Sequence, residues 1–238
     1  MSVLQYCQSA CTTTELILRN IMPKSKSSKR WLNEHFDDHY VQLARKEGYR
    51  SRAIYKLQEL DNKYHLFHPG QVIVDLGAAP GSWSQYAMLK VGDHGRVIAS
   101  DLLLMDSIAG VDFIQGDFRE ETVLQAILAA IQSDPTAITN SDKKRQADLV
   151  ISDMAPNMSG VDAVDIPRAM YLLELSQDLA DRVLKPKGGF VGKLFQGQGT
   201  DQWLADQRKR YQKLVVKKPK ASRPRSREVY VIATGFKG

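Results

Sequence analysis

Four apolar segments of this chain end in or next to an aspartate, and these acids are the residues whose type and spacing point most directly to chemistry. They are Asp75, Asp101, Asp117 and Asp153. If the segments are parallel strands, their carboxyl ends meet at one edge of a sheet, where such sheets bind ligands. Carboxylates gathered there repel one another unless a positive charge offsets them. The pattern therefore predicts a site for a cationic ligand.

The segment 72–85 reads as a buried strand, a glycine-containing turn and the start of a helix. Its β-branched beginning, Val72-Ile73-Val74, is typical of a strand covered on both faces. Glycines in the turn let backbone N–H groups approach a ligand closely. The spacing from Asp75 to Gly81 is Asp-x-Gly-x-x-x-Gly and not the Gly-x-Gly-x-x-Gly that seats a pyrophosphate. This favours S-adenosylmethionine, whose adenosyl group carries no phosphate, over NAD, with a turn kept only for packing as the alternative.

The next two acids have positions that suit the nucleoside part of such a cofactor. Asp101 ends the segment 96–101, about twenty residues after Gly81, where a carboxylate can accept both ribose hydroxyls. Asp117 follows a third short strand and could accept the adenine amino group. An N-cap for the helix expected over 120–131 is the alternative for Asp117.

Two lysines stand next to apolar patterns. Lys193 lies inside the apolar strand expected over 190–196, where an ammonium group is costly to bury without a partner. Lys56 lies beside a helical apolar stripe formed by Ala53, Leu57, Leu60 and Tyr64. Periodicity alone favours a solvated lysine at position 56, whereas Lys193 needs a specific partner.

The elements that position these residues alternate between strand and helix patterns. Strands are expected over 72–76, 96–101, 111–117, 147–153, 190–196, 214–217 and 228–233, and helices over 40–46, 53–64, 120–131, 167–184 and 201–211. The polar stretch 133–146 is expected to be a surface insert. The alternation predicts one α/β domain of the Rossmann-like, doubly wound type. Its seven-stranded sheet should be mostly parallel, with an antiparallel last strand.

The composition indicates which binding partners and which cellular compartment to expect for this protein. The chain has 238 residues and a formal net charge of +6, which favours a polyanionic partner. Its two cysteines, Cys7 and Cys11, are too few for a disulfide framework and show no metal-binding spacing, so we expect no metal. No apolar run approaches the length of a membrane span, and 1–21 lacks the features of a signal peptide. We expect a cytoplasmic monomer that does not bind a membrane.

The two ends of the chain carry basic clusters. Residues 1–29 are expected to form a flexible extension and a basic N-terminal arm before the domain 30–238, and translation could start at Met1 or Met22. The positive residues are Lys24, Lys26, Lys29 and Arg30 near the start, and Lys217, Lys218, Lys220, Arg223, Arg225 and Arg227 near the end. Both clusters could follow the phosphates of a nucleic acid. A solvated charged loop is the alternative.

Several motifs resemble the FtsJ-like ribose 2'-O-methyltransferases, in particular the branch that modifies the large-subunit ribosomal RNA. The matching segments are 51–57, 75–85, 152–160, 164–171 and 226–230. The resemblance implies a catalytic tetrad of Lys56, Asp153, Lys193 and Glu228, and cofactor contacts from Gly81, Trp83, Asp101, Asp117 and Asp153. It further implies S-adenosylmethionine as cofactor and, as substrate, a uridine of 23S rRNA in the assembled large ribosomal subunit. Ser82 departs from the family pattern, in which a second glycine is common.

The chemistry of the acceptor agrees with this class. Methylation at carbon five of a pyrimidine normally uses a cysteine nucleophile, and both cysteines lie outside the expected fold. Methylation of an exocyclic amine commonly uses an Asn/Asp-Pro-Pro-aromatic loop, whereas Asp153 is followed here by Met-Ala-Pro-Asn. A hydroxyl acceptor fits best. The alternatives are a ribose of tRNA or of an mRNA cap, a small-molecule or protein acceptor, and a cofactor-binding RNA module without catalysis.

Overall fold

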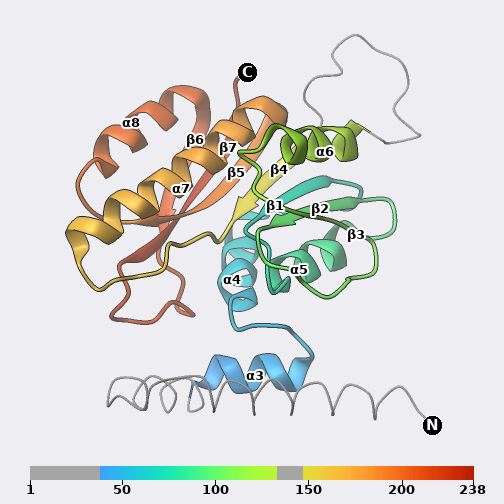
Figure 1. Cartoon of the computed structure of the whole chain (residues 1–238), viewed down its shortest axis with the longest axis horizontal. Coiled ribbons are helices and arrows are strands. Elements are labelled where there is room, and N and C mark those ends of the chain that lie inside the picture. The colour runs from blue at the N-terminus through green and yellow to red at the C-terminus, as the bar shows by residue number, and fades with distance from the viewer. Residues whose placement is uncertain (1–37, 133–146) are drawn as a thin grey trace. The chain divides into compact units, whose positions relative to one another are not determined.

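The structure, a computed structural model, describes residues 38–132 and 147–238 (Figure 1). The extension and basic arm expected over 1–29 and the insert expected over 133–146 lie outside the described residues. Residues 44–238 form one compact unit, which contains the sheet and every site discussed below. Helix α3 (His39–Glu47) precedes the sheet in the chain.

The unit is built on a seven-stranded sheet with the order β3-β2-β1-β4-β5-β7-β6. Its strands are β1 (Val72–Leu76), β2 (Arg96–Asp101), β3 (Val111–Gln115), β4 (Ala147–Ser152), β5 (Leu184–Phe195), β6 (Tyr211–Lys217) and β7 (Glu228–Phe236). β1 to β5 pair in parallel, whereas β7 runs antiparallel between β5 and β6. The Rossmann-like fold predicted from the alternation of strands and helices, including the antiparallel last strand, is confirmed.

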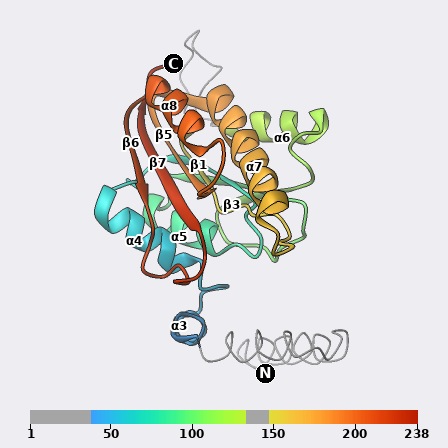
Figure 2. The same cartoon turned by 90° about the vertical axis from the view of Figure 1, so that its left-hand side faces the viewer.

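Helices cover both faces of this sheet, as Figure 2 shows. Those on one face are α4 (Ile54–Tyr64) and α5 (Ser82–Val91), and those on the other are α6 (Glu121–Gln132), α7 (Asp162–Val183) and α8 (Thr200–Arg210). The larger apolar core lies under α6, α7 and α8 and includes Ile127, Leu179 and Phe190. With both faces covered, the polar groups of the parallel strands become accessible at the strand ends.

Two element boundaries differ from the sequence prediction. α7 begins at Asp162 and not at 167, because the carboxylate of Asp165 accepts hydrogen bonds from the backbone of Ser159 and Gly160 and so fixes the chain that enters the helix. Pro167 lies in the second turn of this helix, where its missing N–H removes one backbone hydrogen bond. The predicted start at 167 was therefore wrong, whereas the predicted end near 184 agrees with the observed end at Val183.

β5 begins at Leu184 and not at 190. Its first residues pair with Ala147 of β4 across a register shift, and Lys187 within the irregular part has a φ of 69°. The Lys-Pro-Lys-Gly-Gly sequence therefore forms a bulged extension of the strand, where proline and glycine are acceptable because regular pairing is interrupted.

Candidate active site

Lys193 projects from near the carboxyl end of β5 into a buried polar cluster. Its side chain is only 7% exposed, and Nζ lies 2.8 Å from Oδ1 of Asp153. Nζ also donates a hydrogen bond of 2.8 Å to the backbone carbonyl of Asp153. The partner that a lysine in an apolar strand requires is thus the acid that directly follows β4.

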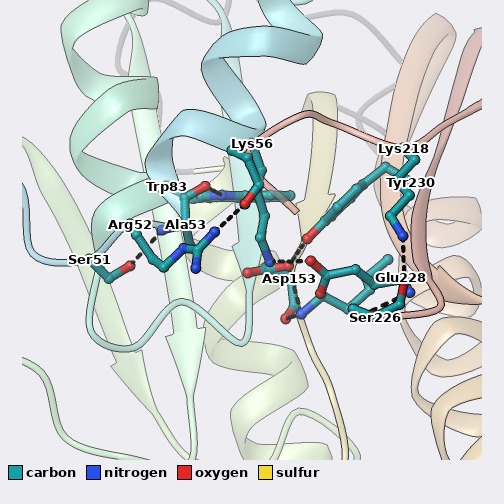
Figure 3. A network of polar contacts seen from close by, with 12 residues as sticks. Ser51, Arg52, Ala53, Lys56, Trp83, Asp153, Lys218, Ser226, Glu228 and Tyr230 are labelled. Atoms are coloured by element: carbon teal, nitrogen blue, oxygen red, sulfur yellow. Dashed lines mark hydrogen bonds and ion pairs between the residues drawn. The ribbon is translucent and has the colours of Figure 1, made fainter. Parts of the chain in front are cut away.

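Lys56 and Glu228 form a second buried ion pair beside the first (Figure 3). Nζ of Lys56, on α4, lies 2.9 Å from Oε1 of Glu228 at the start of β7, and the two side chains are 11% and 12% exposed. The solvated lysine that periodicity favoured at position 56 is therefore wrong. The structure brings together all four residues that the family resemblance groups as a tetrad.

Tyr230 links the two ion pairs, and the sequence reasoning did not select it. It is fully buried, and its hydroxyl donates a hydrogen bond to Oδ1 of Asp153. Nζ of Lys56 lies 5.7 Å from the centre of its ring, which also packs 5.7 Å from the ring of Trp83. The strand period contained the signal, because Glu228 and Tyr230 are two residues apart on β7 and so share one face.

The charges of this cluster stabilise one another. Burial alone would raise the pKa of Asp153, but the ammonium groups of Lys193 and Lys56 lower it overall. The pKa of Glu228 is lowered by the same two lysines against the effect of its burial. Burial and the neighbouring carboxylates raise the pKa of Tyr230 well above its usual value, which keeps the hydroxyl protonated as a donor. Near neutral pH, both carboxylates are therefore ionised.

A cavity of about 600 Å³ opens next to this cluster at the carboxyl ends of β1, β2 and β4. Its size suits a ligand as large as a nucleoside derivative. Its lining includes Gly77, Ala79, Asp101, Leu102, Leu103, Asp117, Arg119, Asp153 and Met154. Three of the expected cofactor residues, Asp101, Asp117 and Asp153, thus lie in one cavity wall, and Asp153 belongs to both the cavity and the polar cluster.

Asp101 and Asp117 already have partners in the protein. Oδ2 of Asp101 accepts the N–H of Ala79, and Oδ1 accepts the N–H of Leu103, both at 2.8 Å. Asp117 forms an ion pair with Arg119, which lowers the pKa of the carboxyl. α6 begins only at Glu121, so Asp117 is not its N-cap residue. Each carboxylate oxygen keeps a lone pair that a ligand could use.

Gly81 and Trp83 do not line this cavity. Gly81 has a φ of 102°, and a Cβ atom there would lie 2.9 Å from Nη1 of Arg50. Nε1 of Trp83 donates to the carbonyl of Ala53, at 2.8 Å, which joins α5 to the segment before α4. The glycines that line the cavity are Gly77 and Gly116, and a Cβ atom at Gly77 would lie 2.2 Å from Cγ of Met154.

Asp75 is fully enclosed beneath the cavity wall. Its side chain accepts a hydrogen bond of 2.6 Å from the hydroxyl of Ser84. Burial raises the pKa of Asp75 to about 7, and the negative charges of Asp153 and Asp101 add to the shift. The pKa of Asp75 is thus shifted in the opposite direction to the pKa values of Asp117 and Asp153, so Asp75 is less suited than these two to remain ionised.

The stability of the fold should therefore depend on the proton of Asp75. Between the unfolded pKa near ~4 and the folded pKa, the folded state holds a proton that the unfolded state releases, so this contribution to stability falls as pH rises. We expect Asp75→Asn to be more stable than the parent at pH 8 by about 1 to 4 kcal/mol, and nearly equal to it at pH 4. Urea unfolding at both pH values measures this, with the exposed Asp112→Asn as control. An equal difference at the two pH values would contradict the assignment.

Comparison with known proteins gives the family. The model of the FtsJ-like methyltransferase family matches residues 49–236. The chain is 57% identical over 217 residues to the ribosomal RNA large subunit methyltransferase E of Cellvibrio japonicus, covering 91% of this chain and 98% of that protein. It is also 57% identical over 217 residues to the protein of the same name from Hahella chejuensis, covering 91% of this chain and 100% of that protein. The chain belongs to the FtsJ-like methyltransferase family.

Solved structures agree with this membership. A Plasmodium falciparum protein assigned as a ribosomal RNA methyltransferase superposes with a TM-score of 0.67 at 29% identity, covering 80% of this chain and 100% of that one. A fibrillarin/Nop5p complex matches with a TM-score of 0.51 at 15% identity over 79% of this chain and 85% of that one, which reflects the fold alone.

An FtsJ-like methyltransferase needs a methyl donor, and the cavity beside the ion pairs fits one. Its wall contains the carboxylates of Asp101, Asp117 and Asp153, which would favour a positively charged donor. Within 38–132 and 147–238, no three His, Cys, Asp or Glu side chains are arranged to hold a metal ion. None of the helices in these ranges has the length and apolar character required to cross a bilayer.

Proposed function

We propose that this FtsJ-like methyltransferase transfers a methyl group from S-adenosylmethionine to the ribose 2'-hydroxyl of a uridine in 23S rRNA of the assembled large ribosomal subunit. The observation that carries the proposal is the pair of buried ion pairs, Lys193–Asp153 and Lys56–Glu228, adjoining an acid-lined cavity through Asp153. The names of the related proteins support the rRNA substrate. The choice of a uridine and of its 2'-oxygen follows from the resemblance to the family.

In this proposal, the four tetrad residues act on the acceptor hydroxyl. Lys193 either removes the proton of the 2'-hydroxyl, which requires its neutral amine form, or as the ammonium orients the oxygen lone pair, since an alcohol is barely ionised near neutral pH. Asp153 holds Nζ of Lys193 in place through the contacts at 2.8 Å. Lys56, fixed by Glu228, positions the acceptor ribose. Whether Lys193 acts as base or as orienting group is tested below.

Asp101 and Asp117 are proposed to bind the cofactor in the cavity, whereas the two lysines of the ion pairs are proposed to act on the acceptor. The cofactor supplies a methyl group made electrophilic by a sulfonium centre. Asp101 accepts hydrogen bonds from its ribose hydroxyls, Asp117 accepts from its adenine amino group, and Asp153 contributes negative charge near the sulfonium. Gly81 and Trp83 support the turn and the helix start that form this side of the site.

Loss of the Asp101 carboxylate should weaken cofactor binding. We expect Asp101→Ala to reduce the binding free energy by about 1 to 3 kcal/mol, because a partly buried acceptor is removed and the Ala79 and Leu103 amides lose their partner. Isothermal calorimetry measures the change. Asp106→Ala, an exposed acid on the same loop, serves as the matched control. Unchanged affinity in Asp101→Ala would place the cofactor elsewhere.

The basic segment 217–227 would bind RNA phosphates. Some of its cations have partners in the protein: Nζ of Lys218 donates to the carbonyls of Pro224 and Ser226, and Arg227 pairs with Asp162. These contacts shape the segment, as Figure 3 shows for Lys218 and Ser226. Lys217 and Lys220 are better candidates for direct phosphate contacts. The basic residues Lys24, Lys26, Lys29 and Arg30, which lie outside the described residues, are proposed to bind RNA phosphates as well.

Removal of positive charge from this segment should change the salt dependence of RNA binding. We expect the double variant Lys217→Gln/Lys220→Gln to reduce the slope of log affinity against log salt by roughly 0.7 to 0.9 for each phosphate that is no longer neutralised. The matched control is Lys209→Gln/Lys237→Gln, which removes the same charge beyond the opposite end of β6. Filter binding to a 23S rRNA fragment over a salt series measures both slopes. Equal slopes in the two variants would place the RNA interface elsewhere.

One experiment tests the proposed function as a whole. Labelled S-adenosylmethionine is offered with isolated large subunits, free ribosomal RNA, tRNA, capped mRNA and small acceptors, and the methylated position is mapped. Product on a uridine 2'-oxygen in the large subunit supports the proposal. Product on another acceptor corrects the substrate, and cofactor and RNA binding without product would indicate a binding module.

A further inference from the structure

One side of the cavity is formed by two loops that no sheet hydrogen bond holds together. They are the turn 77–81, which contributes Ala79 to the cavity wall, and the loop 102–108, which contributes Leu102 and Leu103. Asp101 joins them from the cavity side, because its carboxylate accepts one backbone N–H from each. A ligand held by these loops requires that their separation be fixed.

Arg50 joins the same two loops through their carbonyl groups. Its Nη1 donates to the carbonyl of Pro80 at 2.9 Å and to that of Asp106 at 2.7 Å, and its Nη2 donates to the carbonyl of Ser107 at 2.8 Å. The planar guanidinium offers several donors in a fixed geometry, which lets one side chain bond three carbonyls at once. Arg50 and Asp101 therefore make complementary connections, one through carbonyl groups and the other through N–H groups.

The backbone that carries the Arg50 side chain is also held in place. The N–H of Arg50 donates to Oε1 of Gln85 at 3.0 Å, and the hydroxyl of Ser51 lies 2.8 Å from that of Ser82. Together with the bond from Trp83 to the carbonyl of Ala53, two residues that Figure 3 labels, these contacts attach the segment 50–53 to the start of α5. Arg50 therefore lies on a segment that is held against the start of α5 and does not belong to a flexible basic arm.

Gly81 provides the space that this contact requires. A Cβ atom at this position would lie 2.9 Å from Nη1 of Arg50 and 2.8 Å from Cδ1 of Ile108. The absence of a side chain at Gly81 therefore admits the guanidinium between the two loops. This gives the glycine a role in the site even though it does not line the cavity.

We propose that Arg50 is a positioning residue of the cofactor site, which sets the separation of the loops 77–81 and 102–108, and that it does not contact RNA phosphate. The nature of the ligand rests on the proposed function. Three of the N–H donors of Arg50 are already used by carbonyls, so a phosphate contact through them would break the connection. Arg52, two residues later, donates instead to the carbonyl of Ala221 in the basic segment. The two neighbouring arginines therefore serve different loops.

The test compares Arg50→Gln, Arg50→Lys and Arg52→Gln. We expect both Arg50 variants to raise the dissociation constant for S-adenosylmethionine about 10-fold, because lysine keeps the charge but cannot bond three separate carbonyls in a fixed plane. Turnover at saturating cofactor should stay within about 3-fold of the parent, and the salt slope of RNA binding should not change. Arg52→Gln should leave the cofactor dissociation constant unchanged.

Two results would overturn the assignment. One is a cofactor dissociation constant within 2-fold of the parent in both Arg50 variants. The other is cofactor affinity restored in Arg50→Lys, together with a salt slope of RNA binding that is reduced by roughly 0.7 to 0.9 in Arg50→Gln and unchanged in Arg50→Lys, which is the behaviour of a phosphate contact made by a positive charge.

Hydrogen exchange provides a measurement that needs no cofactor. Amides of 77–82 and 102–108 should exchange about 10-fold faster in Arg50→Lys, while those of the central strands β1 and β4 keep their parent rates. Unchanged exchange in both loops would reject the connection. If the parent itself binds no S-adenosylmethionine, the proposed function fails, and the exchange result still decides whether Arg50 holds the loops.

Discussion

Replacement of Lys193 by alanine is expected to reduce methyl transfer by about 10²- to 10⁴-fold while leaving the affinity for S-adenosylmethionine nearly unchanged. The side chain is almost completely buried, and its only partners within hydrogen-bond distance in the described structure are the carboxylate and the carbonyl of Asp153. Neither contact belongs to the part of the cavity proposed for the nucleoside. Loss of the lysine should therefore affect the acceptor step and not cofactor binding.

Single-turnover transfer to large ribosomal subunits, with the product position mapped, measures this effect. Lys213→Ala, which removes an exposed lysine from β6, is the control and should keep the parent rate. A Lys193→Ala rate within a few fold of the parent, with chemistry shown to limit the rate, would remove Lys193 from the mechanism.

Lys193→Arg separates the two proposed roles of Lys193, general base and orienting group, because arginine stays protonated and can orient the hydroxyl but not deprotonate it. Substantial activity with arginine would reject the general base.

The sheet could be predicted from the sequence because each strand carries its own local signal. Apolar runs ending in an acid located β1, β2 and β4, and the alternation with helices fixed their parallel arrangement. The starts of α7 and β5 were wrong: α7 begins before Pro167, and the Lys-Pro-Lys-Gly-Gly sequence, interpreted as a break after the helix, belongs to β5. Pro167 lies inside a helix whose entry is held by Asp165, and the glycines near 188 lie in a bulged strand.

The site residues could be predicted from the sequence only in part, because the geometry of the site depends on which strands are neighbours in the sheet. Lys193 stood out because it is a charge in an apolar strand, whereas Lys56 looked like an ordinary helix lysine until Glu228 was placed 2.9 Å away. The period of β7 places Tyr230 on the same face as Glu228, but its pairing directly opposite Lys193 of β5 cannot be predicted from residue spacing along one strand. Arg50 was missed for the same reason, since its three acceptors lie 30 to 57 residues away in the chain.

Asp153→Asn is expected to have the second largest effect, because this carboxylate joins the cavity to both ion pairs. Oδ1 of Asp153 accepts from Lys193 and from the hydroxyl of Tyr230, and the asparagine oxygen can accept the same two bonds without the charge. Two buried ammonium groups would then share the single carboxylate of Glu228. We expect turnover to fall by about 10²- to 10³-fold, and the free energy of unfolding at pH 7 to fall by about 1 to 3 kcal/mol.

The pH dependence identifies the charge of Asp153 as the cause. The folded pKa of this carboxyl is lowered, so its contribution to stability is present above the unfolded pKa near ~4 and is lost as pH falls through the folded pKa. The stability difference between the parent and Asp153→Asn should therefore be largest at neutral pH and shrink below about pH 4. Urea unfolding from pH 3 to pH 7 measures it, with Asp206→Asn as control, since that variant removes the carboxylate of an exposed ion pair with Lys209. A stability difference between the parent and Asp153→Asn that stays constant down to pH 3 would mean that the shape of this side chain, and not its charge, stabilises the cluster. Normal turnover in Asp153→Asn would show that the proposed alignment of Lys193 needs no carboxylate.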